Sequence, residues 1–247
     1  MNWIALCLSV VLLSLADAGF GQAPEELLQQ SFLFGKAHAV QMRITMETYR
    51  GDSSKRREIE VFIKRQEKVY KMLLHIVYPA FLNQMKFLSH KAEDGNESKW
   101  LKTSSGVKKL AEQDRSERIF DSDLTVEDLS AVKVADYQLT LVGQLETDSG
   151  LCYAIEAVPR LRGSLYRKKV VFVEKETGLP RAVEYYGEGS ELMKRLQIVS
   201  IQTIGGITFP LLCRIDSYDS ATYTIVRFHE IRVVDDLPEK VFNKGAL

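Results

Sequence analysis

The sequence predicts a mainly β protein built on one strongly curved antiparallel sheet that follows a single short helix. Two observations carry this prediction. Apolar and polar residues alternate with a period of two in most segments after residue 40, which is typical of strands with one buried face. Short turns join these segments, so neighbouring strands run antiparallel, and the eleven or twelve strands expected must form a sheet that curls or closes.

Composition excludes several classes of protein. The 247 residues carry 33 basic and 33 acidic side chains, so the formal net charge is zero, and 45% of the residues are hydrophobic. A dedicated nucleic-acid-binding protein usually has a basic excess, and a disordered chain has fewer apolar residues. The length suits a single all-β domain, and we predict no nucleic-acid partner.

The first residues have the pattern of a cleavable export signal. An apolar run from Trp3 to Leu15 is too short to span a bilayer of about 30 Å as a helix, and it is followed by small residues that suit cleavage after Ala18. Ala23 is a second possible cleavage point, and an N-terminal anchor helix is the alternative reading. Cys7 lies inside the run and not at the cleavage point, so no lipid-bearing cysteine is expected. We therefore predict a signal peptide at 1–18 and one exported, soluble domain over 19–247.

A helix is expected from Pro24 to about Gly35, because proline and acidic residues favour a helix start and glycine favours its end. The turn at Gly205-Gly206 can supply the positive φ angles of a two-residue hairpin. Beyond the alternating segments 41–47 and 58–64, strands are expected at 68–76, 84–92, 97–102, 136–146, 150–158, 166–174, 180–187, 193–204, 207–218 and 221–234.

One polar stretch, residues 103–131, interrupts the strands. Its only apolar residues at regular intervals are Phe120, Leu124 and Leu129, and residues 125–129 resemble one or two helical turns capped by Asp123 or Thr125. A long insertion in a compact β domain is often functional, and a plain surface loop is the alternative.

Catalytic and metal-binding motifs are not evident. The four histidines are dispersed, and no zinc, nucleophile-elbow or phosphate-loop pattern occurs, so we predict no metal, no cofactor and no enzyme activity. Acidic pairs such as Glu127-Asp128 suit helix caps or strand ends. Cys152 and Cys213 lie in strands that are not consecutive, which favours two buried thiols over a disulfide.

The inward-facing strand residues are almost all apolar, and two readings of them remain open. They form a cavity for an apolar ligand such as an acyl chain, or a solid core closed by the N-terminal helix. Methionine suits a cavity for irregular apolar guests. The candidate cavity residues are Met42, Ile44, Met46, Ile59, Val61, Ile63, Leu73, Phe87 and Trp100.

The order of several short motifs resembles the LolA-like outer membrane lipoprotein-sorting family over residues 25–246. A strand that ends in Lys64-Arg65 precedes a second strand and then a hairpin leading to Trp100-Leu101. Further markers are the segments 114–116, 120–129, 175–180, 205–210 and 237–242. The resemblance implies a half-open, incomplete β-barrel with a helical lid, here the insertion at about 103–131, over an apolar cavity for acyl chains.

The resemblance also implies contacts between lid and barrel. Arg65 matches an arginine that ties the two together, and it shares strand parity with Ile63; an exposed arginine at the strand end is the alternative. Phe120, Leu124 and Leu129 are the expected lid residues.

The function implied is that of a periplasmic carrier for lipoprotein acyl chains or other lipids, acting as a monomer between an inner-membrane transporter and an outer-membrane acceptor. The alternatives are an accessory module of an inner-membrane exporter without carrier activity, and a secreted hydrolase whose nucleophile the sequence does not display.

Overall fold

A computed structural model describes residues 23–31, 37–66, 69–130, 134–148, 150–160 and 163–247. The helix α1 covers Pro24–Ser31, within the range predicted, and residues 32–36 of the predicted helix lie outside the described residues. The predicted export signal at 1–18 lies outside them as well. None of the helices in the described part of the chain has both the length and the apolar character that crossing a bilayer requires.

Thirteen strands form one antiparallel sheet in the order β6-β5-β4-β3-β2-β1-β13-β12-β11-β10-β9-β8-β7. The strands are β1 Ala39–Arg50, β2 Ser53–Gln66, β3 Val69–Tyr78, β4 Lys86–Lys91, β5 Glu97–Thr103, β6 Gly106–Leu110, β7 Tyr137–Thr147, β8 Gly150–Pro159, β9 Lys168–Glu174, β10 Pro180–Tyr186, β11 Leu192–Ile204, β12 Ile207–Ser217 and β13 Thr222–Val234. Short 3₁₀ turns occupy Ala80–Leu82, Glu112–Ser116, Ile119–Asp121, Val134–Asp136, Glu239–Phe242 and Lys244–Ala246.

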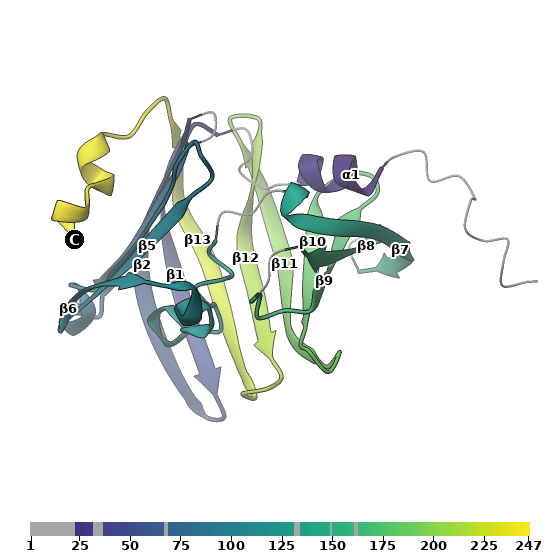
Figure 1. Cartoon of the computed structure of the whole chain (residues 1–247), viewed down its shortest axis with the longest axis horizontal. Helices are drawn as coiled ribbons and strands as arrows, with labels where there is room; N and C mark the ends of the chain where they lie inside the picture. The colour runs from purple at the N-terminus through teal and green to yellow at the C-terminus, as the bar shows by residue number, and fades with distance from the viewer. Residues whose placement is uncertain (1–22, 32–36, 67–68, 131–133, 149, 161–162) are drawn as a thin grey trace, which may run out of the picture.

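The sheet consists of two meanders that meet where β1 pairs with β13 (Figure 1). The edge strands are β6 and β7, so the sheet remains open. Figure 1 shows that the sheet is strongly curved. The predicted mainly β, open-barrel class is confirmed. The turn between β11 and β12 also behaves as predicted, because Gly205 and Gly206 both have positive φ angles, 58° and 76°.

The start of the predicted insertion is wrong, because Gly106–Leu110 forms the edge strand β6. This strand was missed because four of its five residues are exposed, so no apolar alternation marks it. From here on, "the insertion" means residues 111–130, which contain short 3₁₀ turns and no α-helix. The predicted helical turn at 125–129 is a hydrogen-bonded turn in which the Asp128 N–H donates to the Thr125 carbonyl over 3.1 Å.

Three segments cover the sheet. The insertion packs on the concave face of β1–β4 and β11–β13, and α1 packs through Leu27 against Ile155 and Val173 on the same face near the β7 edge. The C-terminal segment packs on the opposite, convex face, where Leu237 and Phe242 are buried. Cys152 and Cys213 are buried and free, as predicted.

Candidate functional site

The concave face presents a continuous apolar surface built from strand alternation. Side chains at alternate positions of β1 and β2 project to this face, and the register places Ile44 beside Ile59 and Met42 beside Val61. Seven of the nine candidate cavity residues belong to this single cluster and are at least nine-tenths buried: Met42, Ile44, Met46, Ile59, Val61, Ile63 and Phe87.

Leu73 and Trp100 do not lie on the concave face. Leu73 pairs with Phe62, one residue out of step with the concave positions, and both Leu73 and Trp100 pack beneath Leu237 and Phe242 on the convex face. They were assigned to the cavity because β3 is apolar on both faces, which removes the period-two signal.

The insertion covers the apolar surface. Phe120 is 3% exposed and packs within the concave cluster with Ile119 and Val126, while Leu124 and Leu129 are partly buried against it. The three predicted lid residues thus come together over the strands that they were expected to cover. In this arrangement Phe120 and its neighbours occupy the space above the concave cluster, so an acyl chain can lie on those strands only if the insertion moves.

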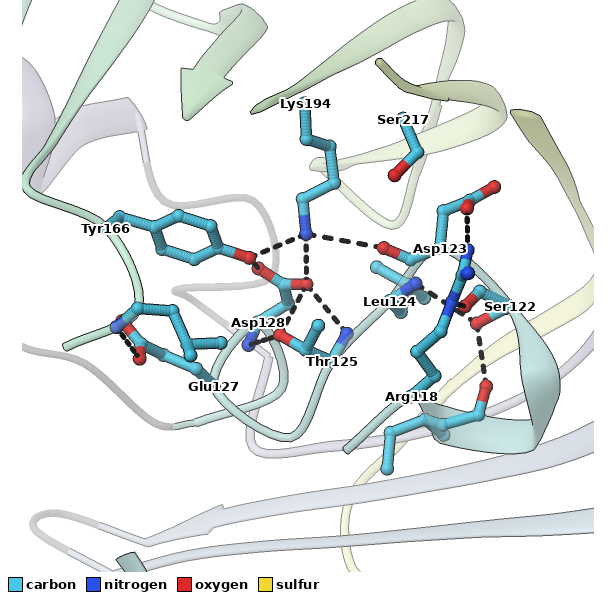
Figure 2. Close-up of polar contacts among 12 residues, drawn as sticks. Arg118, Ser122, Asp123, Leu124, Thr125, Glu127, Asp128, Tyr166, Lys194 and Ser217 are labelled. Atoms are coloured by element: carbon cyan, nitrogen blue, oxygen red, sulfur yellow. Dashed lines mark hydrogen bonds and ion pairs between the residues drawn. The ribbon is translucent and has the colours of Figure 1, made fainter. Parts of the chain in front are cut away.

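Buried polar groups attach the insertion to β11. The Asp128 carboxylate forms an ion pair with the Lys194 ammonium, accepts a hydrogen bond from the Tyr166 hydroxyl over 2.9 Å, and accepts the Thr125 N–H over 2.7 Å (Figure 2). Lys194 also donates to the Tyr166 hydroxyl over 2.8 Å and to the Asp123 carbonyl over 3.3 Å. Lys194 is 4% exposed. Burial lowers the pKa of Lys194, and Asp128 opposes that shift by stabilising the ammonium.

A second polar group attaches the insertion to β13. The Asp123 carboxylate pairs with Arg118 and accepts hydrogen bonds from the hydroxyls of Thr222 over 2.5 Å and Thr224 over 2.6 Å. Asp123 is 2% exposed. Since a buried carboxylate without partners is costly, these donors fix the position of the segment that carries Phe120.

Glu127 and Asp121 add further contacts to the attachment. Glu127 accepts the Leu165 N–H over 2.8 Å in the loop between β8 and β9. Asp121 pairs with Arg57 over 3.0 Å and with Lys55 over 3.2 Å on β2. Polar groups on β2, β11, β13 and the β8–β9 loop therefore hold the insertion on the apolar face.

The predicted contact of Arg65 with the insertion stays a prediction. The Arg65 guanidinium lies 5.6 Å from the ring centre of Tyr70 at the far end of β2. The arginine of β2 that pairs with the insertion is Arg57, eight residues earlier and on the same face.

Sequence reasoning passed over Arg57, Arg118, Tyr166 and Lys194, and it gave Asp123 only as a candidate helix cap. A usable signal was present: Lys194 has the parity of Leu196 and Ile198, and Thr222 and Thr224 have the parity of Val226, so each interrupts an apolar strand face. Within the described residues, no group of three or more His, Cys, Asp or Glu side chains is placed to hold a metal ion.

Three solved structures share the fold of this chain. A solved DUF1329 family protein from Desulfovibrio piger ATCC 29098 superposes with a TM-score of 0.83 at 21% identity, covering 92% of this chain and all of that one. A putative outer membrane lipoprotein-sorting protein domain from Vibrio parahaemolyticus gives 0.81 at 20% identity, with 90% and 94% covered. A LolA superfamily protein from Nitrosomonas europaea gives 0.74 at 19% identity, with 92% and 100% covered.

A protein-family model described as "-like: Uncharacterized protein" matches residues 68–247, which is more than half of the chain. The chain belongs to this family. No curated protein matches the sequence. At these identities the solved structures establish the fold, and the predicted resemblance to LolA-like proteins is confirmed at that level.

Proposed function

We propose that this protein is a periplasmic carrier that binds the acyl chains of lipoproteins or other lipids on the concave face and moves them toward the outer membrane. The observation that carries the proposal is a continuous apolar surface covered by an insertion that polar contacts attach. The lipoprotein-sorting description of a solved structure with the same fold supports it. We further propose export by the segment 1–18, a monomeric state, binding without catalysis, and exchange with an inner-membrane transporter and an outer-membrane acceptor.

A lipid chain on the concave face would regain apolar burial that the insertion loses when it moves. Full burial of a phenylalanine such as Phe120 is worth about 1.5–3 kcal/mol, whereas each buried methylene contributes about 0.8 kcal/mol. Two to four methylenes therefore offset the loss of one Phe120 contact, and a longer chain has burial free energy left over to offset the broken polar contacts.

Methionine supports the same reading. Met42, Met46 and Met72 are buried in the concave cluster, and unbranched thioether side chains repack around differently shaped apolar partners at low cost. The concave face would therefore accept chains of different length and branching.

Lipid capture tests the proposal. The protein would be titrated with a fluorescent fatty acid and examined by native mass spectrometry after purification from membranes. We expect a lipid-mass adduct, and we expect Ile44→Trp to reduce binding severalfold because it fills the concave face. Val199→Trp is the matched control, because Val199 is 56% exposed on β11 and should leave binding unchanged.

Failure of the wild-type protein to bind any acyl probe, together with no lipid adduct, would sink the carrier proposal. Equal loss of binding in both tryptophan variants would show that the concave face is not the binding surface.

A further inference from the structure

A pocket of about 370 Å³ lies at the rim of the concave face, where β1, β2 and β13 meet the insertion. It is lined by three basic side chains, three hydroxyl-bearing side chains and one carboxylate, namely Arg50, Lys55, Arg118, Thr48, Ser53, Thr222 and Asp121. Guanidinium and ammonium donors in one concavity are typical of a site for an oxyanion.

The positive charge at this rim exceeds the negative charge. Arg118 is matched by Asp123, whereas Lys55 and Arg57 share the single carboxylate of Asp121. Arg50 has no acidic partner among the described residues. One anionic group of an added ligand would therefore improve the charge balance.

Arg57 provides an independent observation of unused binding capacity beside the pocket. Its side chain is 5% exposed, and its Nε and Nη1 atoms have no hydrogen-bond partner among the described residues. Burial lowers the pKa of Arg57, and Asp121 opposes that shift. Within the described part of the chain, only Nη2 of this buried guanidinium has a hydrogen-bond acceptor. An additional acceptor that reached the free N–H groups would therefore be stabilised.

Asp121 connects this charged rim to the apolar face. Phe120 and Asp121 both have left-handed backbone angles, with φ of 52° and 55°, so the chain turns sharply between a buried aromatic ring and an exposed carboxylate. The Asp121 side chain is 66% exposed, and its carboxylate is held to the sheet by Lys55 and Arg57 alone among the described residues. A competing anion at these cations would release Asp121 and so remove one of the contacts that hold the segment carrying Phe120.

We propose that this rim pocket binds a phosphate group, the headgroup of a lipid whose acyl chains lie on the concave face, and that the phosphate replaces Asp121 as the partner of Lys55 and Arg57. The inference rests on the proposed carrier function and narrows its cargo to anionic, phosphate-bearing lipids. Headgroup binding thereby favours uncovering of the apolar face, because it removes the Asp121 contacts next to Phe120 and leaves the Asp123 and Asp128 contacts to be broken by the acyl chains.

The test uses the full chain and three probes: inorganic phosphate, dihexanoyl phosphatidic acid, and dihexanoylglycerol, which has the same acyl chains without the phosphate. Dissociation constants are measured for wild type, Arg50→Gln, Lys55→Gln, Asp121→Asn and Arg56→Gln. Arg56 is the matched control, because it neighbours Lys55 on β2 but pairs with Glu58 outside the pocket. Thermal melts check that each variant folds.

We expect Arg50→Gln and Lys55→Gln each to weaken phosphatidic acid binding by about tenfold, the usual effect of losing one charge-assisted hydrogen bond. Asp121→Asn should strengthen it, because the competing carboxylate is removed. Arg56→Gln should change it less than twofold, and dihexanoylglycerol affinity should be the same in wild type, Arg50→Gln and Lys55→Gln.

Equal affinities for phosphatidic acid and dihexanoylglycerol in every variant would overturn the pocket while leaving the carrier proposal intact. Binding of inorganic phosphate as tight as that of phosphatidic acid would overturn the headgroup assignment in favour of a free anion. Phosphate binding that depends on Lys55, with no binding of either lipid, would support the anion site and refute the carrier function on which the lipid assignment rests.

Discussion

The ion pair between Lys194 and Asp128 should be the strongest single attachment of the insertion, and Asp128→Asn tests it. Both side chains are nearly inaccessible, at 6% and 3% exposure. Removing one partner of a buried pair typically costs about 3–5 kcal/mol, because the remaining charge stays buried. Lys194 keeps two oxygen partners, the Tyr166 hydroxyl and the Asp123 carbonyl, so the lower end of that range applies, about 3 kcal/mol.

For a domain of this size, each kcal/mol shifts the melting temperature by about 2–4 °C, so Asp128→Asn should lower it by roughly 6–12 °C. The double variant Asp128→Asn with Lys194→Met removes the buried charge and should recover most of the loss. Glu156→Gln is the control, because its pair with Lys168 is about one-third exposed and worth only about 0.2–1 kcal/mol.

The loss should also depend on pH. In Asp128→Asn the folded state disfavours the Lys194 ammonium more strongly than the unfolded chain does, so the unfolded state binds more protons and stability rises with pH. The difference in the free energy of unfolding between wild type and Asp128→Asn should therefore shrink between pH 7 and 10. Urea denaturation across this range measures it. Additive losses in the double variant, or a deficit that grows with pH, would refute the reasoning.

Three further predictions concern the rest of the fold. Lys71 and Lys64 lower the pKa of Glu239 to about 2, so its stabilising contribution is complete above the ordinary glutamate pKa and is lost as pH falls toward 2. Trp100 fluorescence should report loosening of the C-terminal segment in that window, and Glu239→Gln should remove most of the change. Phe242→Ala should cost about 3–5 kcal/mol in urea denaturation, because the ring is 1% exposed; a loss below about 1 kcal/mol would contradict its role in the convex core. Burial raises the pKa of Cys213 to about 12, and Cys152 is fully buried, so neither thiol should react with a thiol reagent at pH 8 until the protein is denatured. If Cys152 or Cys213 reacted in the folded protein as fast as an exposed cysteine does, the strands that carry them would have to open.

Part of the candidate site was accessible to sequence reasoning because it depends on local periodicity. Alternation along residues 41–47 and 58–64 assigns Ile44 and Val61 to one face whichever strands pair with them. The family resemblance, and not periodicity, gave Phe120 as a residue of the lid, and the structure buries it over the strands. Leu73 was misassigned because a strand covered on both faces has no alternation to read.

The polar attachment depended on tertiary structure. Lys194 and Asp128 are 66 residues apart, and Thr224 and Asp123 are 101 apart. Their meeting requires the insertion to cross the concave face and β13 to pair with β1, and neither feature leaves a pattern within a local window. The chain has many lysines and aspartates. Only burial distinguishes the Lys194–Asp128 pair from solvent-exposed pairs, and burial is a property of the folded chain.

The sequence by itself determined the strand content, a sheet that curls or closes, and the apolar character of one face, because these follow from period-two alternation and turn residues that act over a few positions. Only the tertiary structure decided what covers that face and which charges hold the cover, since those contacts join residues brought together by the curvature of the whole sheet. Its rim pocket arises in the same way, where three strands and the insertion place Arg50, Lys55 and Arg118 around one space.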